Sequence, residues 1–201
     1  MIENPFLGVG LNDVSLAEIP MPSVDATAPN KLLERCPEAG PTPLVALGSF
    51  AGAGSVFVKD ERDRMGLGSF KALGAAYVIA CEAAAGRAEG QTFVCASAGN
   101  HGLSVAAGAQ AFKAKAVIYL SRTVPEAFAE RLRARGAEVR RVDGSYEESM
   151  GAAAKAAVVE GFKLLSDSSW PGYTEYPFRL MEGYLAMADE AAEAMAEPPT
   201  H

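Results

Sequence analysis

The chain has 201 residues, of which 49% are hydrophobic and 21% charged, which is typical of a globular protein with one sizeable core or two small lobes. The net charge of −7 and the lack of clustered basic residues argue against a nucleic-acid-binding protein. No apolar run is long enough to span a membrane and no signal-peptide pattern opens the sequence, so we expect a cytoplasmic protein. Two histidines and three widely spaced cysteines offer little material for a metal site, and we expect the cysteines to be reduced.

A charged loop followed by a helix start places one lysine in an unusual position. Val56–Val58 is predicted to be a buried strand, and the charged, glycine-containing stretch 59–68 is predicted to be a loop. Ser69 is a candidate N-cap, so Lys71 is expected in the first turn of a helix. The helix dipole disfavours an ammonium there by about 0.3–1 kcal/mol, and so favours the neutral amine that a Schiff-base nucleophile needs. On position alone, an exposed lysine on an amphipathic helix is the more common case.

After this helix, strands and helices alternate along the chain. Strands are predicted at 92–96, 116–120, 137–142 and 162–166, and helices at 101–112, 125–135, 146–160 and about 176–196. This alternation predicts right-handed βαβ units, and therefore an α/β fold with open parallel sheets covered by helices. In the last helix we expect a core-facing stripe of Phe178, Met181, Tyr184, Leu185 and Ala188. A tight turn is expected within Ala51–Gly54, and a short helix near Asn30–Arg35.

Two strand-to-helix loops are candidate sites, because ligands of open α/β sheets bind at the carboxyl ends of the strands. The first comprises Ser97, Ala98, Gly99, Asn100, His101 and Gly102. Backbone N–H groups at such a helix start can hold a carboxylate or a phosphate. Asn100 either donates to a ring hydroxyl or caps the helix, and His101 is either a general base or a packed or capping histidine. In the second loop, Asp167 either takes up a proton beside aromatic residues or begins an Asx-turn.

Five short segments carry a family pattern: Pro41–Leu44, Lys59–Glu61, Gly68–Lys71, Ser97–Gly102 and Arg135–Val139. In this order they resemble the pyridoxal-phosphate enzymes of the tryptophan synthase β-chain fold. Two further blocks, Arg64–Lys71 and Asp167–Tyr173 with the following Pro177 and Met181–Tyr184, are similar to the diaminopropionate ammonia-lyases. The Asp167–Tyr173 block is the more specific, because related dehydratases lack it.

The resemblance implies a role for each matching residue. Lys71 matches the lysine that holds the cofactor covalently, next to Phe70, and Asn100 matches the asparagine that hydrogen-bonds the cofactor ring oxygen. Asp167 matches an acid near the substrate α-carbon, so Lys71 and Asp167 are the implied catalytic residues. The substrate carboxylate is implied to bind at Ser97, Ala98, Gly99, His101 and Gly102. The implied reaction is α,β-elimination of ammonia from 2,3-diaminopropionate to pyruvate.

The resemblance also implies the domain organisation. Residues 1–86 are expected to form the N-terminal part of a large cofactor domain, 87–161 a small α/β domain, and 162–201 a return to the large domain that stops before a glycine-rich phosphate loop. We therefore expect the N-terminal part of a larger enzyme, inactive by itself, and a homodimer for the full-length form. No metal, nucleic acid or membrane partner is expected.

One position departs from the lyase pattern. Those enzymes usually carry aspartate before the glycine of the asparagine loop, whereas this chain has Ala98, as threonine and serine dehydratases do. A dehydratase-like enzyme is therefore an alternative. The other alternative is a non-catalytic α/β module that binds a partner chain.

Overall fold

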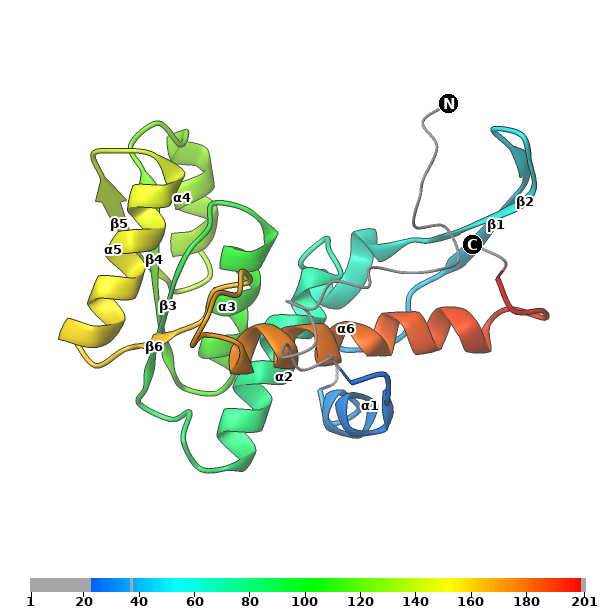
Figure 1. The fold of residues 1–201 in the computed structure, drawn as a ribbon, viewed down its shortest axis with the longest axis horizontal. Helices are drawn as coiled ribbons and strands as arrows, with labels where there is room; N and C mark the ends of the chain where they lie inside the picture. The colour runs from blue at the N-terminus through cyan, green and yellow to red at the C-terminus, as the bar shows by residue number, and fades with distance from the viewer. Residues whose placement is uncertain (1–22, 37, 200–201) are drawn as a thin grey trace.

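The computed structural model describes residues 23–36 and 38–199. These form two sheets, and a long helix near the C-terminus extends in space from one sheet to the other (Figure 1). A parallel four-stranded sheet has the order β5-β4-β3-β6, and a separate antiparallel hairpin is formed by β1 and β2. The first 22 residues of the predicted unit 1–86, and the last two of the predicted unit 162–201, lie outside the described residues. The predicted α/β class with a parallel sheet is confirmed.

The parallel sheet consists of β3 (Thr92–Ala96), β4 (Lys115–Ser121), β5 (Glu138–Val142) and β6 (Lys163–Leu164). Strand β3 is central, with Val94 opposite Val117 on one side and Leu164 on the other. Strand β6 is shorter than the predicted 162–166. After Leu165, whose N–H donates to the Val94 carbonyl at 2.8 Å, the Ser166 N–H turns to the Tyr173 hydroxyl and the ladder ends.

Helices cover both faces of this sheet, as the alternation predicts. Helix α5 (Tyr146–Val159) covers one face, and α3 (Asn100–Ala111) and α4 (Glu126–Arg133) cover the other (Figure 1). Successive residues of a strand point to opposite faces. Val94 therefore packs with Ala153 and Ala156 of α5, whereas Phe93 joins the larger core on the opposite face. Helix α2 (Lys71–Ala84) packs on the outer side of α3 and extends that larger core.

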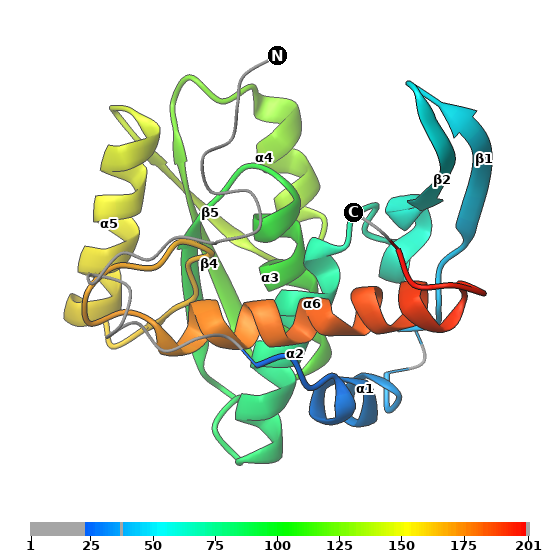
Figure 2. The same cartoon turned by 45° about the vertical axis from the view of Figure 1, so that its right-hand side comes forward.

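Helix α6 (Glu175–Glu193) packs along α2, with the short α1 (Thr27–Leu33) beside both (Figure 2). Its buried residues are Pro177, Leu180, Gly183 and Ala186, so the predicted stripe is confirmed only in part: Tyr184 packs against the core, whereas Met181 is 40% exposed. A Cβ on Gly183 would lie 2.8 Å from the Leu73 carbonyl oxygen. Small residues thus let α6 approach the backbone of α2, and this close contact sets which face is buried.

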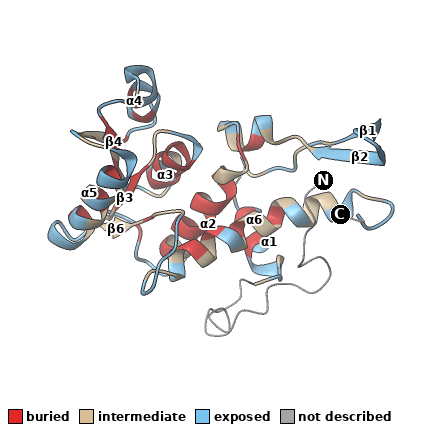
Figure 3. Ribbon diagram, turned by 45° about the horizontal axis from the view of Figure 1, so that its top comes forward, coloured by how far each residue is buried: buried red, intermediate tan, exposed pale blue. Residues whose placement is uncertain are grey.

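The hairpin pairs β1 (Leu44–Phe50) with β2 (Ala53–Lys59) through a tight turn at Ala51 and Gly52, both with positive φ, as expected. The predicted burial of Val56–Val58 is wrong, because Phe57 and Val58 are 48% and 43% exposed. Within residues 23–36 and 38–199 the two strands form a ladder only with each other, and most of their residues are exposed (Figure 3). The predicted loop that follows contains the 3₁₀ turns η2 (Glu61–Gly66).

Candidate active site

Lys71 is the first residue of α2, as expected for the first turn of a helix. Phe70 occupies the N-cap position and no side chain caps the helix there. The predicted cap residue, Ser69, lies one position earlier, where its hydroxyl accepts a hydrogen bond from the Lys71 N–H at 3.3 Å. The cap is thus displaced by one residue, and Lys71 stays at the positive end of the helix dipole.

Lys71 and Asp167 meet, although they lie 96 residues apart in sequence. Lys71 Nζ donates to Asp167 Oδ2 at 2.5 Å, and the two side chains remain 33% and 22% exposed. Asp167 reaches this position because it follows β6 at the carboxyl edge of the parallel sheet, where the start of α2 also lies. The structure therefore joins the two residues with implied catalytic roles in one ion pair.

The asparagine loop lies beside Asp167 at the same sheet edge. Strands β3 and β6 pair in parallel with Phe93 opposite Lys163 and Val94 opposite Leu164, a register that continues toward Ser97 and Asp167. The His101 ring crosses between the two loops, where its Nε2–H donates to the Leu165 carbonyl at 2.8 Å.

The six residues of this loop divide into an open part and a buried part. Gly99 and Asn100 are exposed, and no side chain caps the first amides of α3, so Asn100 does not act as a cap. His101 is only 2% exposed, which makes it a packed histidine. A Cβ on Gly102 would lie 2.1 Å from the Ser97 carbonyl oxygen, so glycine is required for close packing of the loop on the helix.

The electrostatics favour an ionised Asp167. Burial raises the pKa of Asp167, but the charges of His101 and Lys71 and the Lys71 hydrogen bond outweigh burial and lower it. Burial also lowers the pKa of His101 from its ordinary 6.5, so the ring is neutral at pH 7 and Lys71 is the charge that acts there. Asp167 is therefore a carboxylate at neutral pH and can accept hydrogen bonds with both oxygens.

Tyr184 belongs to the surroundings of this site and is absent from the predicted site residues. Its ring makes an edge contact with Phe70, with centroids 5.0 Å apart, and a Cβ on Gly74 would touch that ring at 2.5 Å. Tyr184 Oη and His101 Nδ1 are buried without hydrogen-bond partners among the described residues. Burial and the nearby charge of Asp167 raise the pKa of Tyr184 to about 12, so its hydroxyl keeps its proton.

The loop after Asp167 is closed by Tyr173. The Tyr173 hydroxyl accepts from the Ser166 N–H at 2.9 Å and donates to the Leu164 carbonyl at 2.8 Å. Its ring stacks on Trp170 with centroids 4.4 Å apart, and Gly172 between them has φ 85°. The block that carries the specific family resemblance therefore folds back onto the end of β6.

A disulfide, a metal site and a membrane-spanning helix each have requirements that the described residues do not meet. Cys36, Cys81 and Cys95 are free thiols. No three His, Cys, Asp or Glu side chains of the described segments are grouped as metal ligands. None of the helices in the described ranges is both long and apolar enough to cross a membrane.

Comparison with known proteins decides the family. Residues 36–201 match the family described as pyridoxal-phosphate dependent enzymes. The chain belongs to this family. The expected family and the family cofactor, pyridoxal phosphate, are thereby confirmed.

Within the family, ammonia-lyases and dehydratases are among the relatives of this pyridoxal-phosphate enzyme chain. It is 37% identical over 185 residues to diaminopropionate ammonia-lyase of Escherichia coli (strain K12), covering 80% of this chain and 46% of that protein. It is 32% identical over 165 residues to the L-serine dehydratase/L-threonine deaminase of Mus musculus, covering 79% and 46%. The crystal structure of the E. coli lyase with an aminoacrylate-PLP azomethine reaction intermediate matches with TM-score 0.81 at 33% identity, covering 88% of this chain and 50% of that one. The chain thus spans about half the length of these relatives.

Proposed function

We propose that this chain is part of a pyridoxal-phosphate-dependent ammonia-lyase that eliminates ammonia from 2,3-diaminopropionate and yields pyruvate. The observation that carries the proposal is the Lys71–Asp167 pair, with Nζ and Oδ2 2.5 Å apart at the carboxyl edge of the sheet. It joins an amine and a proton acceptor beside a loop with uncapped helix amides. The similarity to the E. coli lyase supports the choice of substrate.

The residues around Lys71 fit the proposed cofactor. Lys71 is one-third exposed, so its amine is accessible to an aldehyde, and the buried Tyr184 Oη and His101 Nδ1 offer unused polar atoms nearby. Lys71, Phe70 and Asn100 would hold the cofactor. When bound, pyridoxal phosphate supplies an electron sink for the charge left on the substrate α-carbon.

The residues of this chain have separate tasks in the proposed reaction. Asp167 is ionised and holds Lys71 Nζ in place through their ion pair, and the neutral amine that reacts with an aldehyde forms when the Lys71 ammonium gives its proton to solvent. The same carboxylate can then receive a proton from bound substrate. The open residues Ser97–Asn100 and the first amides of α3 favour an anionic group, such as the substrate carboxylate. His101 and Gly102, both buried, hold that loop in place.

A serine or threonine dehydratase-like reaction is the second candidate. Ala98 favours it, since the lyase pattern has an acid at that position, and the mouse dehydratase is a relative of similar identity. The Asp167–Tyr173 loop favours the lyase. Replacing Ala98 with Asp should shift turnover toward diaminopropionate if the missing acid is what broadens substrate choice.

The assay that tests the proposed function uses the full-length enzyme of which this chain forms part. Pyruvate release from diaminopropionate and serine, and 2-oxobutyrate release from threonine, would be measured for wild type, K71A and D167N. We expect diaminopropionate to be the best substrate and both variants to lose at least about a hundredfold in kcat/KM. Replacing Lys113, whose side chain is 80% exposed, is the matched lysine control. Preference for serine or threonine would favour the dehydratase, and unchanged activity of K71A would refute both.

The state of the 201-residue chain is a separate part of the proposal. Because it spans about half the length of its relatives, we propose that it has no turnover by itself and that the full-length enzyme is a homodimer. Light scattering of the full-length enzyme measures the second point. Robust pyruvate release by the isolated chain would contradict the first, and absence of cofactor binding by the full-length enzyme would favour a non-catalytic, partner-binding module.

A further inference from the structure

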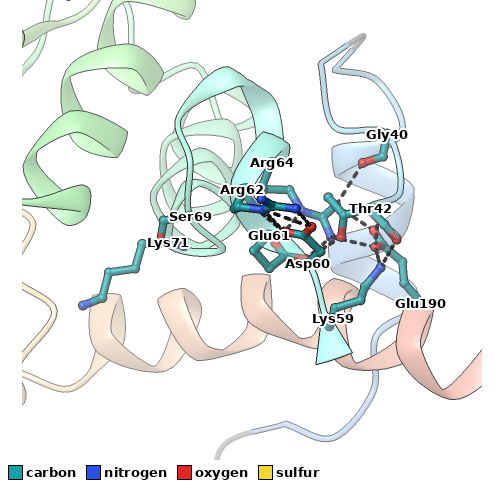
Figure 4. Close-up of polar contacts among 10 residues, drawn as sticks. All are labelled: Gly40, Thr42, Lys59, Asp60, Glu61, Arg62, Arg64, Ser69, Lys71 and Glu190. Atoms are coloured by element: carbon teal, nitrogen blue, oxygen red, sulfur yellow. Dashed lines mark hydrogen bonds and ion pairs between the residues drawn. The ribbon is translucent and has the colours of Figure 1, made fainter. Parts of the chain in front are cut away.

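A group of polar residues around the buried Arg64, here named the Arg64 cluster, lies at the base of the hairpin where it meets the end of α6 (Figure 4). Its members are Gly40, Thr42, Lys59, Glu61, Arg64 and Glu190. The Arg64 side chain is completely buried, although it comes from a charged stretch predicted to be a loop. The cluster thus joins the start of β1, the end of β2 and η2 to α6.

Arg64 uses its whole guanidinium in this cluster. Its Nε and one terminal nitrogen donate to Glu61 at 2.8 and 2.9 Å, and both terminal nitrogens donate to Glu190 at 2.8 and 2.6 Å. The Gly40 carbonyl and the Thr42 hydroxyl accept at 3.0 and 3.1 Å. All five N–H donors are therefore engaged. Paired contacts with two carboxylates fix both the position and the plane of the group.

The segment between Arg64 and Lys71 has an unfavourable backbone conformation, which contacts with its surroundings must stabilise. Met65, Gly66 and Gly68 have φ of 51°, 63° and 79°. Met65 is not a glycine, and a side chain in the left-handed region is maintained only where the surroundings determine the conformation. Arg64 holds one end of this segment, and α2 continues from the other.

Helix α6 links the Arg64 cluster to the Lys71–Asp167 ion pair. Glu190, near its carboxyl end, binds Arg64, and its first residue, Glu175, follows the loop that begins with Asp167. Between these ends α6 packs tightly on α2 through Gly74 and Gly183. Figure 4 shows Lys71 extending away from the cluster, past the segment that connects them. A shift of Arg64 would therefore move Lys71 relative to α6 and to Asp167.

We propose that Arg64 is a positioning residue for Lys71: by fixing residues 65–70 to α6 it holds Lys71 Nζ at Asp167 and sets the reactivity of this amine toward the cofactor. The inference rests on the proposed function. A misplacement of about 1 Å at a reacting group can change a rate by about a hundredfold, so an effect on Lys71 is measurable even where the fold is intact.

The test compares Lys71 with Lys113 within the full-length enzyme of which this chain is proposed to be a part. Borohydride trapping after exposure to pyridoxal phosphate, followed by peptide mapping, measures cofactor capture at each lysine, and reductive methylation with formaldehyde measures simple amine accessibility. In R64K, which keeps the charge but loses the paired donors, we expect capture at Lys71 to fall about tenfold relative to Lys113. Methylation of Lys71 should rise several-fold, because the ion pair that protects it loosens.

Three further variants separate positioning from loss of stability. R62M removes an arginine whose side chain is 86% exposed and should leave both measurements within about twofold of wild type. L132A creates a cavity in the core of α4 and should lower stability while leaving the preference for Lys71 intact. E190Q keeps the shape of the partner and provides the test if R64K does not melt cooperatively.

Each outcome has a defined meaning. Unchanged capture and methylation of Lys71 in folded R64K or E190Q would overturn the positioning role, as would an equal loss in L132A. If wild-type Lys71 of the full-length enzyme captures pyridoxal phosphate no better than Lys113, the proposed function fails. In that case the response of Lys71 methylation to R64K still decides whether Arg64 positions the lysine.

Discussion

The Arg64 cluster and the Lys71–Asp167 pair lie at the two ends of residues 65–70 and use their hydrogen-bonding groups differently. Arg64 is fully buried and engages all of its donors. Lys71 is one-third exposed, and among the described residues only Asp167 accepts from its Nζ. A saturated group of this kind has no capacity left for a ligand, whereas the lysine retains two N–H donors.

The carboxylates at the two places have lowered pKa values for related reasons. At Glu61 and Glu190 burial raises the pKa, but hydrogen bonds from Arg64, with Lys59 nearby, outweigh it. At Asp167 burial is likewise outweighed by His101 and Lys71. Glu190 and Asp167 are exposed to a similar degree, 20% and 22%, so the difference lies in the cations. Arg64 is fully buried and has several partners, whereas Lys71 is one-third exposed and has one among the described residues. Arg64, with all of its donors engaged, therefore fixes the local structure. The Lys71–Asp167 pair is partly exposed and keeps free donors, so it can react with a ligand.

The largest effect is expected from breaking the cluster with R64M. Removing Arg64 from this ion group leaves Glu61 without an ion-pair partner among the described residues and Glu190 with Lys59 alone, which costs about 3–5 kcal/mol. Urea denaturation at pH 7 measures the loss. The control R62M removes an exposed partner of Asp60 and should change stability by less than about 0.5 kcal/mol. Equal losses of unfolding free energy in R64M and R62M would show that the buried and the exposed ion pairs contribute equally to stability.

A third ion group, Glu82 with Arg87 and Lys163, tests the same distinction by pH. Hydrogen bonds from Arg87 and Lys163 lower the pKa of the buried Glu82 from 4.5 to about 2. A depressed folded-state pKa gives stability that is present above pH 4.5 and lost as the pH falls toward 2, here about 3 kcal/mol. We expect E82Q to be less stable than wild type at pH 7, with the difference disappearing near pH 2. A difference that is constant over this range would contradict the assigned pKa.

A smaller effect is expected at the loop beside the ion pair. In G102A the new Cβ meets the Ser97 carbonyl oxygen at 2.1 Å, so the loop must move, at a cost of about 1–3 kcal/mol. G99A is the matched control, because a Cβ there meets nothing within 4 Å and φ is −98°. Thermal melts compare the two. Similar melting temperatures for G102A and G99A would show that the close contact is not needed.

The smallest change in stability is expected from D167N. A partly exposed ion pair contributes about 1 kcal/mol or less, so denaturation should be almost unaffected. Methylation of Lys71, in contrast, should increase because its anionic partner is gone. A loss of several kcal/mol of unfolding free energy in D167N would show that the Lys71–Asp167 pair stabilises the fold as much as the Arg64 cluster does.

The parallel sheet could be predicted from the sequence because burial on both faces leaves a clear pattern. Thr92–Ala96 is predicted and observed with the same bounds. The similar apolar run Val56–Val58 gave a wrong prediction of burial, since the run shows β propensity but not whether another layer covers it. In α6, large side chains suggested one face, and the tight contact of Gly183 with α2 selected another.

The site was predicted in parts. The position of Lys71 followed from the helix start, and the role of Asp167 came from the family resemblance. Their ion pair was not predicted, because it depends on the register of β3 and β6. Arg64 was missed because an arginine within a charged run is usually exposed. Tyr184 was predicted to face the core, and its position beside Phe70 was not predicted. Gly74, which makes room for the Tyr184 ring, indicates this position only when the packing of α2 on α6 is known.

Tyr173 has a consequence for how such a protein can diverge. Its hydroxyl binds the chain at Leu164 and Ser166, so both ends of the loop that begins with Asp167 are tied to the same strand end. For a loop with fixed ends, doubling the length adds only about 0.6 kcal/mol of closure entropy. The segment between Ser168 and Gly172 can therefore change in length and composition over evolutionary time while the sheet stays in place.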